Sequence, residues 1–222
     1  MLIHLISCEN ATCAVPEAYR EIFRDSEETL TSTEGWEPGS LNLAQAFSMK
    51  FRTPLVHGNI TRLLIDLEKD GEERWSRFSL KLPEATRQKI VDRHERPYRT
   101  LLKQRIAGDL SRGRTVLHVM VQTHPTMDGK VRVETRPGAI EAAATATQWC
   151  EEMRKCELDA THTENPGANA LAKDLSAVFP QPNYLQLRLS VSQSFFMEGR
   201  PMRWENCKKI ILETLPQPTG LS

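Results

Sequence analysis

Short apolar runs alternate with segments of helical periodicity along this chain, and this alternation limits the fold more than any other feature. Residues 2–6 and 116–121 are apolar runs of the length of a single buried strand. Residues 41–51 lie between them and repeat apolar side chains at helical spacing. Strands that alternate with helices are typical of α/β proteins with a largely parallel sheet. The sequence therefore predicts an α/β fold.

The remaining elements follow from the same patterns. We expect further strands over 54–67, 114–123, 131–134 and 184–196. Further helices are expected over 17–23, 83–107, 139–155, 170–179 and 201–215. Pro97 should break or kink the second of these helices, and 70–82 and 161–169 are expected to be surface segments. No stretch has the composition of a long linker, so residues 1–222 are predicted to form a single domain.

Charge and hydropathy exclude several classes of partner. Lys and Arg number 29, as do Asp and Glu, so the chain as a whole has no net attraction for a polyanion. We therefore expect no nucleic-acid partner, although a local basic patch stays open. No stretch approaches a membrane span, and the apolar start is too short for a secretory signal. These features favour a cytoplasmic protein without membrane contact.

The cysteines do not indicate a disulfide framework or a thiolate zinc site. There are five, an odd number, and none forms a Cys-x-x-Cys pair. Cys8 lies near the end of the first predicted strand and is a candidate nucleophile. A buried, inert thiol is the favoured interpretation, because free cysteine behaves largely as a small apolar residue.

Glu9 is the first candidate for chemistry. It follows the first predicted strand and precedes a turn, and open α/β sheets bind ligands outside the carboxyl ends of their strands. The alternative is that Glu9 and Asn10 only cap the loop or the next helix.

Six short motifs, taken in their order along the chain, resemble those of the N-formylglutamate amidohydrolase family. The resemblance covers most of the chain and is clearest up to about residue 132. The motifs are ISCE at 6–9, EGWEPG at 34–39, TRLLIDL at 61–67, PYR at 97–99, VLH at 116–118 and DGKVR at 128–132.

The resemblance implies a fold and a reaction. The fold is a three-layer α/β/α sandwich with a central mixed sheet, of the phosphorylase/hydrolase-like kind and similar to zinc carboxypeptidases and aspartoacylases. Members of the family use a metal-bound water to hydrolyse an amide such as that of N-formyl-L-glutamate. Zn²⁺ lowers the pKa of its water, a carboxylate moves protons, and an arginine holds the substrate carboxylate. In this scheme Glu9 is the candidate catalytic carboxylate.

The chain departs from the family at the positions that carry chemistry. Asn10 stands where a histidine is usual, and Gln122 and Thr123 replace the His-Ser that usually ends the central strand. Further departures occur around Thr33, where a histidine is usual, at Glu68, where an asparagine is usual, and at Arg188 and Ser190, where glutamates are usual. Neutral amides are poor zinc ligands compared with imidazole or carboxylate. These substitutions predict a degenerate zinc site and no resident cofactor.

The charged groups of a substrate pocket are retained. Arg62 and Asp66 are expected on one face of an apolar strand, where charges are costly unless they are paired or meet a ligand. They are interpreted either as a buried ion pair or, with Arg99, as residues that bind a small-molecule carboxylate. An exposed helix position is the alternative for Arg99.

Two functions stay open at this point. The first is a divergent N-formylglutamate amidohydrolase-like protein that has lost zinc catalysis and keeps a carboxylate-binding pocket or serves as an interaction subunit, its protein partner unknown. The second is an active metal-dependent amidohydrolase acting on an N-formyl or N-acyl amino acid. It requires zinc in an altered site of Glu9 and His124, with Asn10 or Gln122 at degenerate ligand positions. Whether the chain is an enzyme is therefore left undecided by the sequence.

Overall fold

The computed structural model describes residues 1–165, 169–180, 182–197 and 201–216. In this part of the chain six strands form one mixed sheet in the order β2-β1-β3-β6-β4-β5. The strands are β1 (Leu2–Cys8), β2 (Leu55–His57), β3 (Thr115–His124), β4 (Val131–Thr135), β5 (Ala160–Glu164) and β6 (Tyr184–Ser192). β4 runs antiparallel to β6, and the other neighbouring pairs are parallel.

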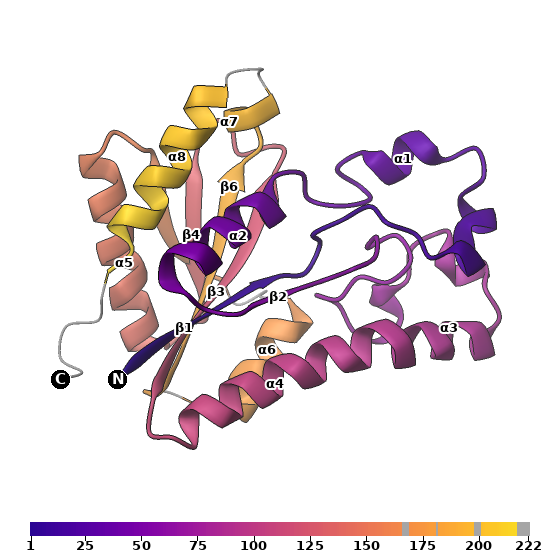
Figure 1. Cartoon of the computed structure of the whole chain (residues 1–222), viewed down its shortest axis with the longest axis horizontal. Coiled ribbons are helices and arrows are strands. Elements are labelled where there is room, and N and C mark those ends of the chain that lie inside the picture. Colours follow the sequence, from indigo (N-terminus) through magenta and orange to yellow (C-terminus); the bar gives the residue numbers. More distant parts are fainter. Residues whose placement is uncertain (166–168, 181, 198–200, 217–222) are drawn as a thin grey trace.

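Helices cover both faces of the sheet, so the predicted three-layer α/β/α sandwich with a mixed sheet is confirmed (Figure 1). One face carries α2 (Ser40–Phe51), α5 (Ile140–Lys155) and α8 (Pro201–Thr214), and the other carries α4 (Arg96–Leu110) and α6 (Ala170–Val178). Because side chains alternate along a strand, β3 sends Leu117, Val119 and Val121 into the first layer and Val116 and Met120 into the second.

The shorter helical elements lie mainly between β1 and β3 in the sequence. They comprise the 3-10 helices η1 (Glu17–Phe23), η2 (Gly71–Arg74) and η3 (Ser79–Lys81), with α1 (Glu27–Thr31) and α3 (Glu84–Ile90). The π-helical turn η4 (Val91–Glu95) and the short helix α7 (Ser194–Met197) complete the list. In Figure 1, α1 and α3 project to one side of the sheet. This projection forms an irregular cover next to the carboxyl ends of β1 and β2.

The predicted strand over 54–67 is wrong in its second half. Only Leu55–His57 pairs with β1, and the segment that follows consists of turns. Leu63, Leu64 and Ile65 are buried as expected, but they pack in the second layer of the core rather than in the sheet. Periodicity does not distinguish a short buried run in a turn from a buried strand. Arg62 and Asp66 therefore lie on a loop, not on one face of a strand.

Other boundaries also differ from expectation. The strand predicted over 184–196 ends at Ser192, and the short helix α7 follows it. β5 is an edge strand in a segment predicted as a loop, and residues 166–168 of that segment lie outside the described residues. Pro97 does not break its helix. It occupies the first turn of α4, directly after the π turn η4, so α3, η4 and α4 follow one another without an intervening loop. A proline within a continuous helical segment lacks an N–H donor and crowds the preceding turn, and the π turn η4 lies where that change of pitch is needed.

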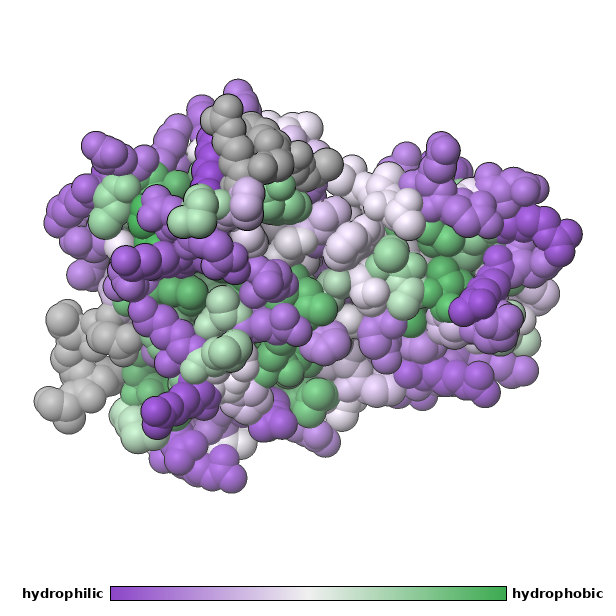
Figure 2. Space-filling view, turned by 45° about the horizontal axis from the view of Figure 1, so that its top comes forward, coloured by the Kyte–Doolittle hydropathy of each residue, from purple (hydrophilic) through white to green (hydrophobic). Residues whose placement is uncertain are grey.

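Figure 2 shows polar side chains over much of one face of the molecule, with apolar residues in separate patches among them. No helix in the described part of the chain is long and apolar enough to cross a bilayer.

Candidate functional site

The candidate site is a buried polar centre at the carboxyl ends of β1, β3 and β6. Glu9 follows the last residue of β1, and Gln122 lies two residues before the end of β3. Arg188 lies on β6, opposite Met120 of β3 in the sheet register. The side chains with even numbers on β3 face the layer of α4 and α6, so the centre opens on that side of the sheet.

Glu9 is buried, with 1% of its surface exposed. Its Oε1 atom accepts a hydrogen bond from the Tyr98 hydroxyl of α4 at 2.8 Å, and its Oε2 atom is buried without a hydrogen-bond partner among the described residues. Burial raises the pKa of Glu9, and the neighbouring hydroxyls of Ser7 and Tyr98 limit the rise. Gly58 permits this packing, since a Cβ atom on Gly58 would lie 2.0 Å from the Glu9 carbonyl oxygen.

Glu68 is the centre of the hydrogen-bond network. Its Oε1 atom accepts from Asn169 Nδ2 at 2.8 Å and from Gln122 Nε2, and its Oε2 atom accepts from Asn10 Nδ2 at 3.3 Å. Asn10 Nδ2 also contacts Glu37 Oε1 at 3.2 Å. Asn10 and Gln122, the two amides that the sequence analysis predicts at degenerate ligand positions, therefore both donate to one buried carboxylate.

Arg188 supplies the positive charge of the centre. Its Nε donates to Gln122 Oε1 at 2.6 Å, and one terminal nitrogen lies 3.2 Å from Glu134 Oε2. The other terminal nitrogen is 4.0 Å from Glu68 Oε1. The same guanidinium lowers the pKa of Glu9, Glu37 and Glu68 and so partly offsets the effect of burial on them. One arginine thus faces a group of buried carboxylates.

Burial dominates the electrostatics of these acids. It raises the pKa of Glu37 to about 7, against the attraction of Arg62. It raises the pKa of Glu68 well above its usual value, and repulsion from Glu37, Asp66 and Glu9 adds to the rise. Burial also raises the pKa of Asp66, which accepts a hydrogen bond from the Glu68 backbone N–H at 3.0 Å. At neutral pH the centre therefore holds protons that an exposed set of carboxylates would release.

The predicted substrate arginines already have protein partners. Arg62 donates to the carbonyl oxygens of Thr33 and of Glu34, the latter at 2.9 Å, and to Glu37 Oε1 at 3.3 Å. Arg62 thus holds the loop that carries Glu37 against the loop that carries Asp66.

Arg99 is similarly engaged. It pairs with Glu95 at 2.8 Å, lies 3.8 Å from Asp174, and donates to the carbonyl oxygen of Lys69 at 2.6 Å. Its side chain is 17% exposed, so it is not the exposed helix arginine of the alternative interpretation.

The histidines of β3 have different surroundings. His118 is fully buried, with its ring nitrogens 2.8 Å from the Tyr184 hydroxyl and 2.9 Å from Ser7 Oγ, and burial lowers its pKa to about 3. His124 is the last residue of β3, is exposed, and contacts Thr126 through Nδ1.

No group of three or more His, Cys, Asp or Glu side chains suited to a metal ion occurs within the described ranges. Cys8 is buried, its Sγ donates to Ser40 Oγ at 3.2 Å, and burial raises the pKa of its thiol well above the usual value. That environment disfavours a nucleophilic thiolate.

Three members of the network escape prediction from the sequence. Tyr98 and Glu134 were present in or beside the motifs, but nothing in their spacing indicates contact with Glu9 or Arg188. Asn169 lies 101 residues from Glu68 in the sequence. One signal for the network is present in the sequence: Glu68 and Arg188 both differ from what the family resemblance predicts, and their charges are opposite.

Comparison with known proteins supports the fold. Searches of family models and of curated proteins find no match. Among solved structures, a gene product of Agrobacterium tumefaciens is 18% identical with a TM-score of 0.77, and the match covers 96% of this chain and 87% of the other. The N-formylglutamate amidohydrolase of Ralstonia eutropha is 14% identical with a TM-score of 0.66, covering 94% and 91%. The chain therefore shares its fold with the amidohydrolase family that its motifs resemble.

Arg188→Met should destabilise the fold, because it removes the charge that offsets several buried carboxylates while keeping an unbranched side chain of similar length. We expect a loss of about 2–3 kcal/mol in the free energy of unfolding at neutral pH, measured by urea denaturation. Arg93→Met is the control, since Arg93 is exposed and should change stability by less than about 0.5 kcal/mol. A loss below about 1 kcal/mol for Arg188→Met would mean that the carboxylates do not depend on this arginine.

Glu37→Gln should change how stability depends on pH. The folded protein holds a proton on Glu37 up to about pH 7, whereas an unfolded chain releases it near pH 4.5. The folded state thus binds more protons in this window, so the free energy of unfolding falls as pH rises through it. Glu37→Gln keeps an oxygen that accepts from Asn10 but cannot titrate. It should reduce the slope of the free energy of unfolding against pH by up to about 1.4 kcal/mol per pH unit.

Urea denaturation at several values between about pH 4.5 and 7.5 measures this slope. Glu34→Gln is the matched control, because the Glu34 side chain is 57% exposed. Identical slopes for Glu37→Gln and the unmodified protein would show that Glu37 is ionised throughout the window.

Proposed function

We propose that this chain is a divergent N-formylglutamate amidohydrolase-like protein in which a hydrogen-bond network stands in place of the zinc site. The observation that carries the proposal is the pair of amides, Asn10 and Gln122, that donate to the buried carboxylate of Glu68. These are the positions where the family resemblance leads one to expect imidazoles.

The donor set of this centre does not fit a zinc ion. Asn10 and Gln122 direct their NH₂ groups at Glu68, and an amide NH₂ offers no lone pair to a metal. The carbonyl oxygen of Gln122 accepts from Arg188 at 2.6 Å, so a cation bound there would meet the guanidinium charge at close range. We therefore derive no hydrolytic step through a metal.

A small carboxylate is the ligand that best suits the remaining donors. A guanidinium has five N–H donors, and three hydrogen bonds from Arg62 are accounted for by the described residues. The side chains of Arg62 and Arg188 are each 25% exposed, so both guanidinium groups reach the surface of the centre. Planar guanidinium groups favour carboxylate partners through paired hydrogen bonds.

A second function, an active metal-dependent amidohydrolase with an altered site, is favoured by one observation. Glu9 Oε2 and Glu37 Oε2 are both buried without hydrogen-bond partners among the described residues. Unpaired buried carboxylate oxygens are satisfied either by a proton or by a cation. In this alternative Glu9 and Glu37 would supply anionic ligands, and His124 at the end of β3 would supply an imidazole.

Metal analysis and an activity assay separate the two functions. We expect the purified protein, equilibrated with zinc and desalted, to retain far less than one zinc per chain by elemental analysis. N-formyl-L-glutamate and N-acetyl amino acids should not be hydrolysed with or without added zinc. The matched variant restores the family residues together through Asn10→His, Gln122→His, Glu68→Asn and Arg188→Glu, and it should retain about one zinc per chain.

Stoichiometric zinc with chelator-sensitive turnover in the unmodified chain would contradict the loss of zinc chemistry and support the altered site. Circular dichroism of the quadruple variant shows whether it is folded. If it is folded and still does not bind zinc, the four positions are not the determinants of metal binding.

Binding of N-formyl-L-glutamate without turnover tests whether the centre keeps a carboxylate-binding pocket. We expect saturable binding by calorimetry in metal-free buffer, and Arg62→Lys should weaken it by about tenfold, because lysine keeps the charge but loses the planar fork. Arg77→Lys is the control, since the Arg77 side chain is 64% exposed and pairs with Glu34 at the surface. Equal binding by Arg62→Lys and the unmodified chain would remove Arg62 from the pocket.

A further inference from the structure

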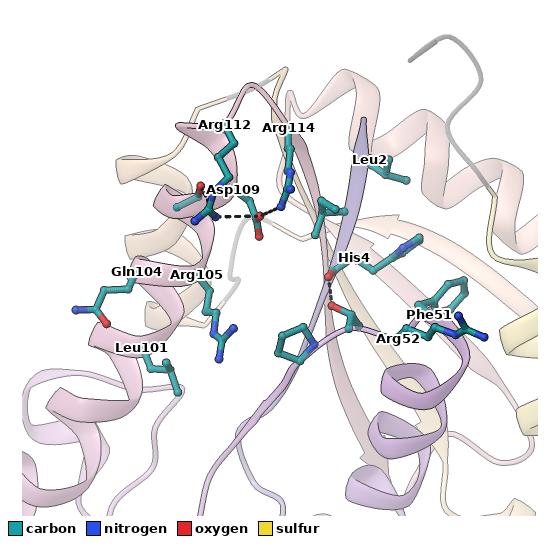
Figure 3. A pocket seen from close by; sticks show the side chains of 14 residues that line it. Leu2, His4, Phe51, Arg52, Leu101, Gln104, Arg105, Asp109, Arg112 and Arg114 are labelled. Atoms are coloured by element: carbon teal, nitrogen blue, oxygen red, sulfur yellow. Dashed lines mark hydrogen bonds and ion pairs between the residues drawn. The ribbon is translucent and has the colours of Figure 1, made fainter.

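A second hollow lies at the opposite end of the sheet from the polar centre. It occupies about 660 Å³ between α4, the amino end of β1 and the segment that follows α2 (Figure 3). This volume is in the range of small-molecule pockets in proteins, about 300–1,000 Å³. None of the residues assigned above to the polar centre lines it.

Basic side chains dominate the lining. Arg52, Arg105, Arg112 and Arg114 line the hollow together with a single acid, Asp109. Asp109 Oδ1 lies 2.8 Å from Arg114 and 3.8 Å from Arg112, so two arginines share one carboxylate. The chain as a whole is neutral, and this excess of positive charge is therefore local.

Arg105 is the arginine most available to a ligand. It is exposed on α4, its guanidinium extends into the hollow in Figure 3, and no ion pair or hydrogen bond links its side chain to another residue in the described ranges. Arg112 and Arg114 come from the same side of the hollow, where the pairing with Asp109 orients them. A group with more than one negative charge would contact several of these guanidinium groups at once.

Arg52 adds a cation at an unusual backbone position. It follows α2 with φ of +49°, in the left-handed region that glycine or asparagine adopts most easily. His4 is not part of the charge, because its ring stacks on Phe51 at 4.2 Å and burial lowers its pKa. The positive field of the hollow therefore comes from arginines, which stay charged at every physiological pH.

The hollow also has apolar walls. Leu2, Phe51, Pro54 and Leu101 line it, and Leu101 is 40% exposed. In Figure 3, Leu101 lies below Arg105, away from Arg112 and Arg114. The hollow thus offers both cationic and apolar surface, as a ligand with an anionic end and an organic body requires.

We propose that this hollow binds an organic phosphate of about nucleotide size. Its phosphate groups would contact Arg105, with Arg112 and Arg114 beside it, and its organic part would lie against Pro54 and Leu101. Arginine suits phosphate because the planar guanidinium donates paired hydrogen bonds to two phosphate oxygens. A single carboxylate would pair with only one guanidinium group, whereas a di- or triphosphate would pair with several.

Calorimetric titration of the full chain with ATP and with pyrophosphate tests this site. We expect saturable binding of ATP that weakens as ionic strength rises from low to physiological, because the contacts are charged and exposed. Arg105→Glu should weaken binding by at least about tenfold, and Arg112→Gln should weaken it by less, since Arg112 already shares Asp109. Arg93→Glu makes the same charge change at an exposed position outside the hollow and should leave binding unchanged.

Thermal melting of each variant confirms that it is folded before it is titrated. No saturable binding of either probe, equal affinity of Arg105→Glu and the unmodified chain, or equal weakening by Arg93→Glu would each overturn the site. Binding of pyrophosphate as tight as that of ATP would overturn the contact with Pro54 and Leu101. Binding of polyglutamate in preference to both phosphates would overturn phosphate as the ligand class.

Discussion

The buried carboxylate of Glu68 is the point at which three parts of the chain meet. It accepts hydrogen bonds from Asn10 after β1, Gln122 on β3 and Asn169 at the start of α6. A buried acid without such donors would be costly, and each amide without an acceptor would also be costly. These hydrogen bonds therefore fix the positions of the Glu68 loop, the end of the sheet and helix α6 relative to one another.

The framework of the fold was predictable because it depends on local pattern. Residues 2–6 and 116–121 are mainly apolar, and the structure places both inside the sheet, in β1 and β3. The antiparallel pairing of β4 with β6 is not visible in either strand, since it depends on how the intervening helices return the chain. A short apolar run such as 63–65 fits a buried turn as well as a buried strand, so the sequence pattern alone predicts the wrong element there.

The candidate site was predictable as a set of unusual residues but not as a network. The sequence draws attention to Asn10, Gln122, Glu68 and Arg188 because each differs from what the family resemblance leads one to expect. Their pairing crosses long distances in the sequence, 54 residues between Glu68 and Gln122 and 66 between Gln122 and Arg188. Spacing does not reveal such contacts. Arg62 shows the converse, because a retained charged residue turns out to bind two loop carbonyls as well as Glu37.

The polar residues of the centre form a set in which the charges and hydrogen bonds depend on one another. The acid at position 68 lies beside Glu37 and Glu9, and the charges of both raise its pKa. Arg188 supplies positive charge at the same place and lowers the pKa of each of them. Amides at 10 and 122 are neutral donors that satisfy the Glu68 carboxylate, and Gln122 accepts from Arg188 in return. An acid at 188 would leave the carboxylates without their cation. Each residue therefore supplies a charge or a hydrogen-bond partner that the others require, and removing one member leaves a buried polar group without its partner.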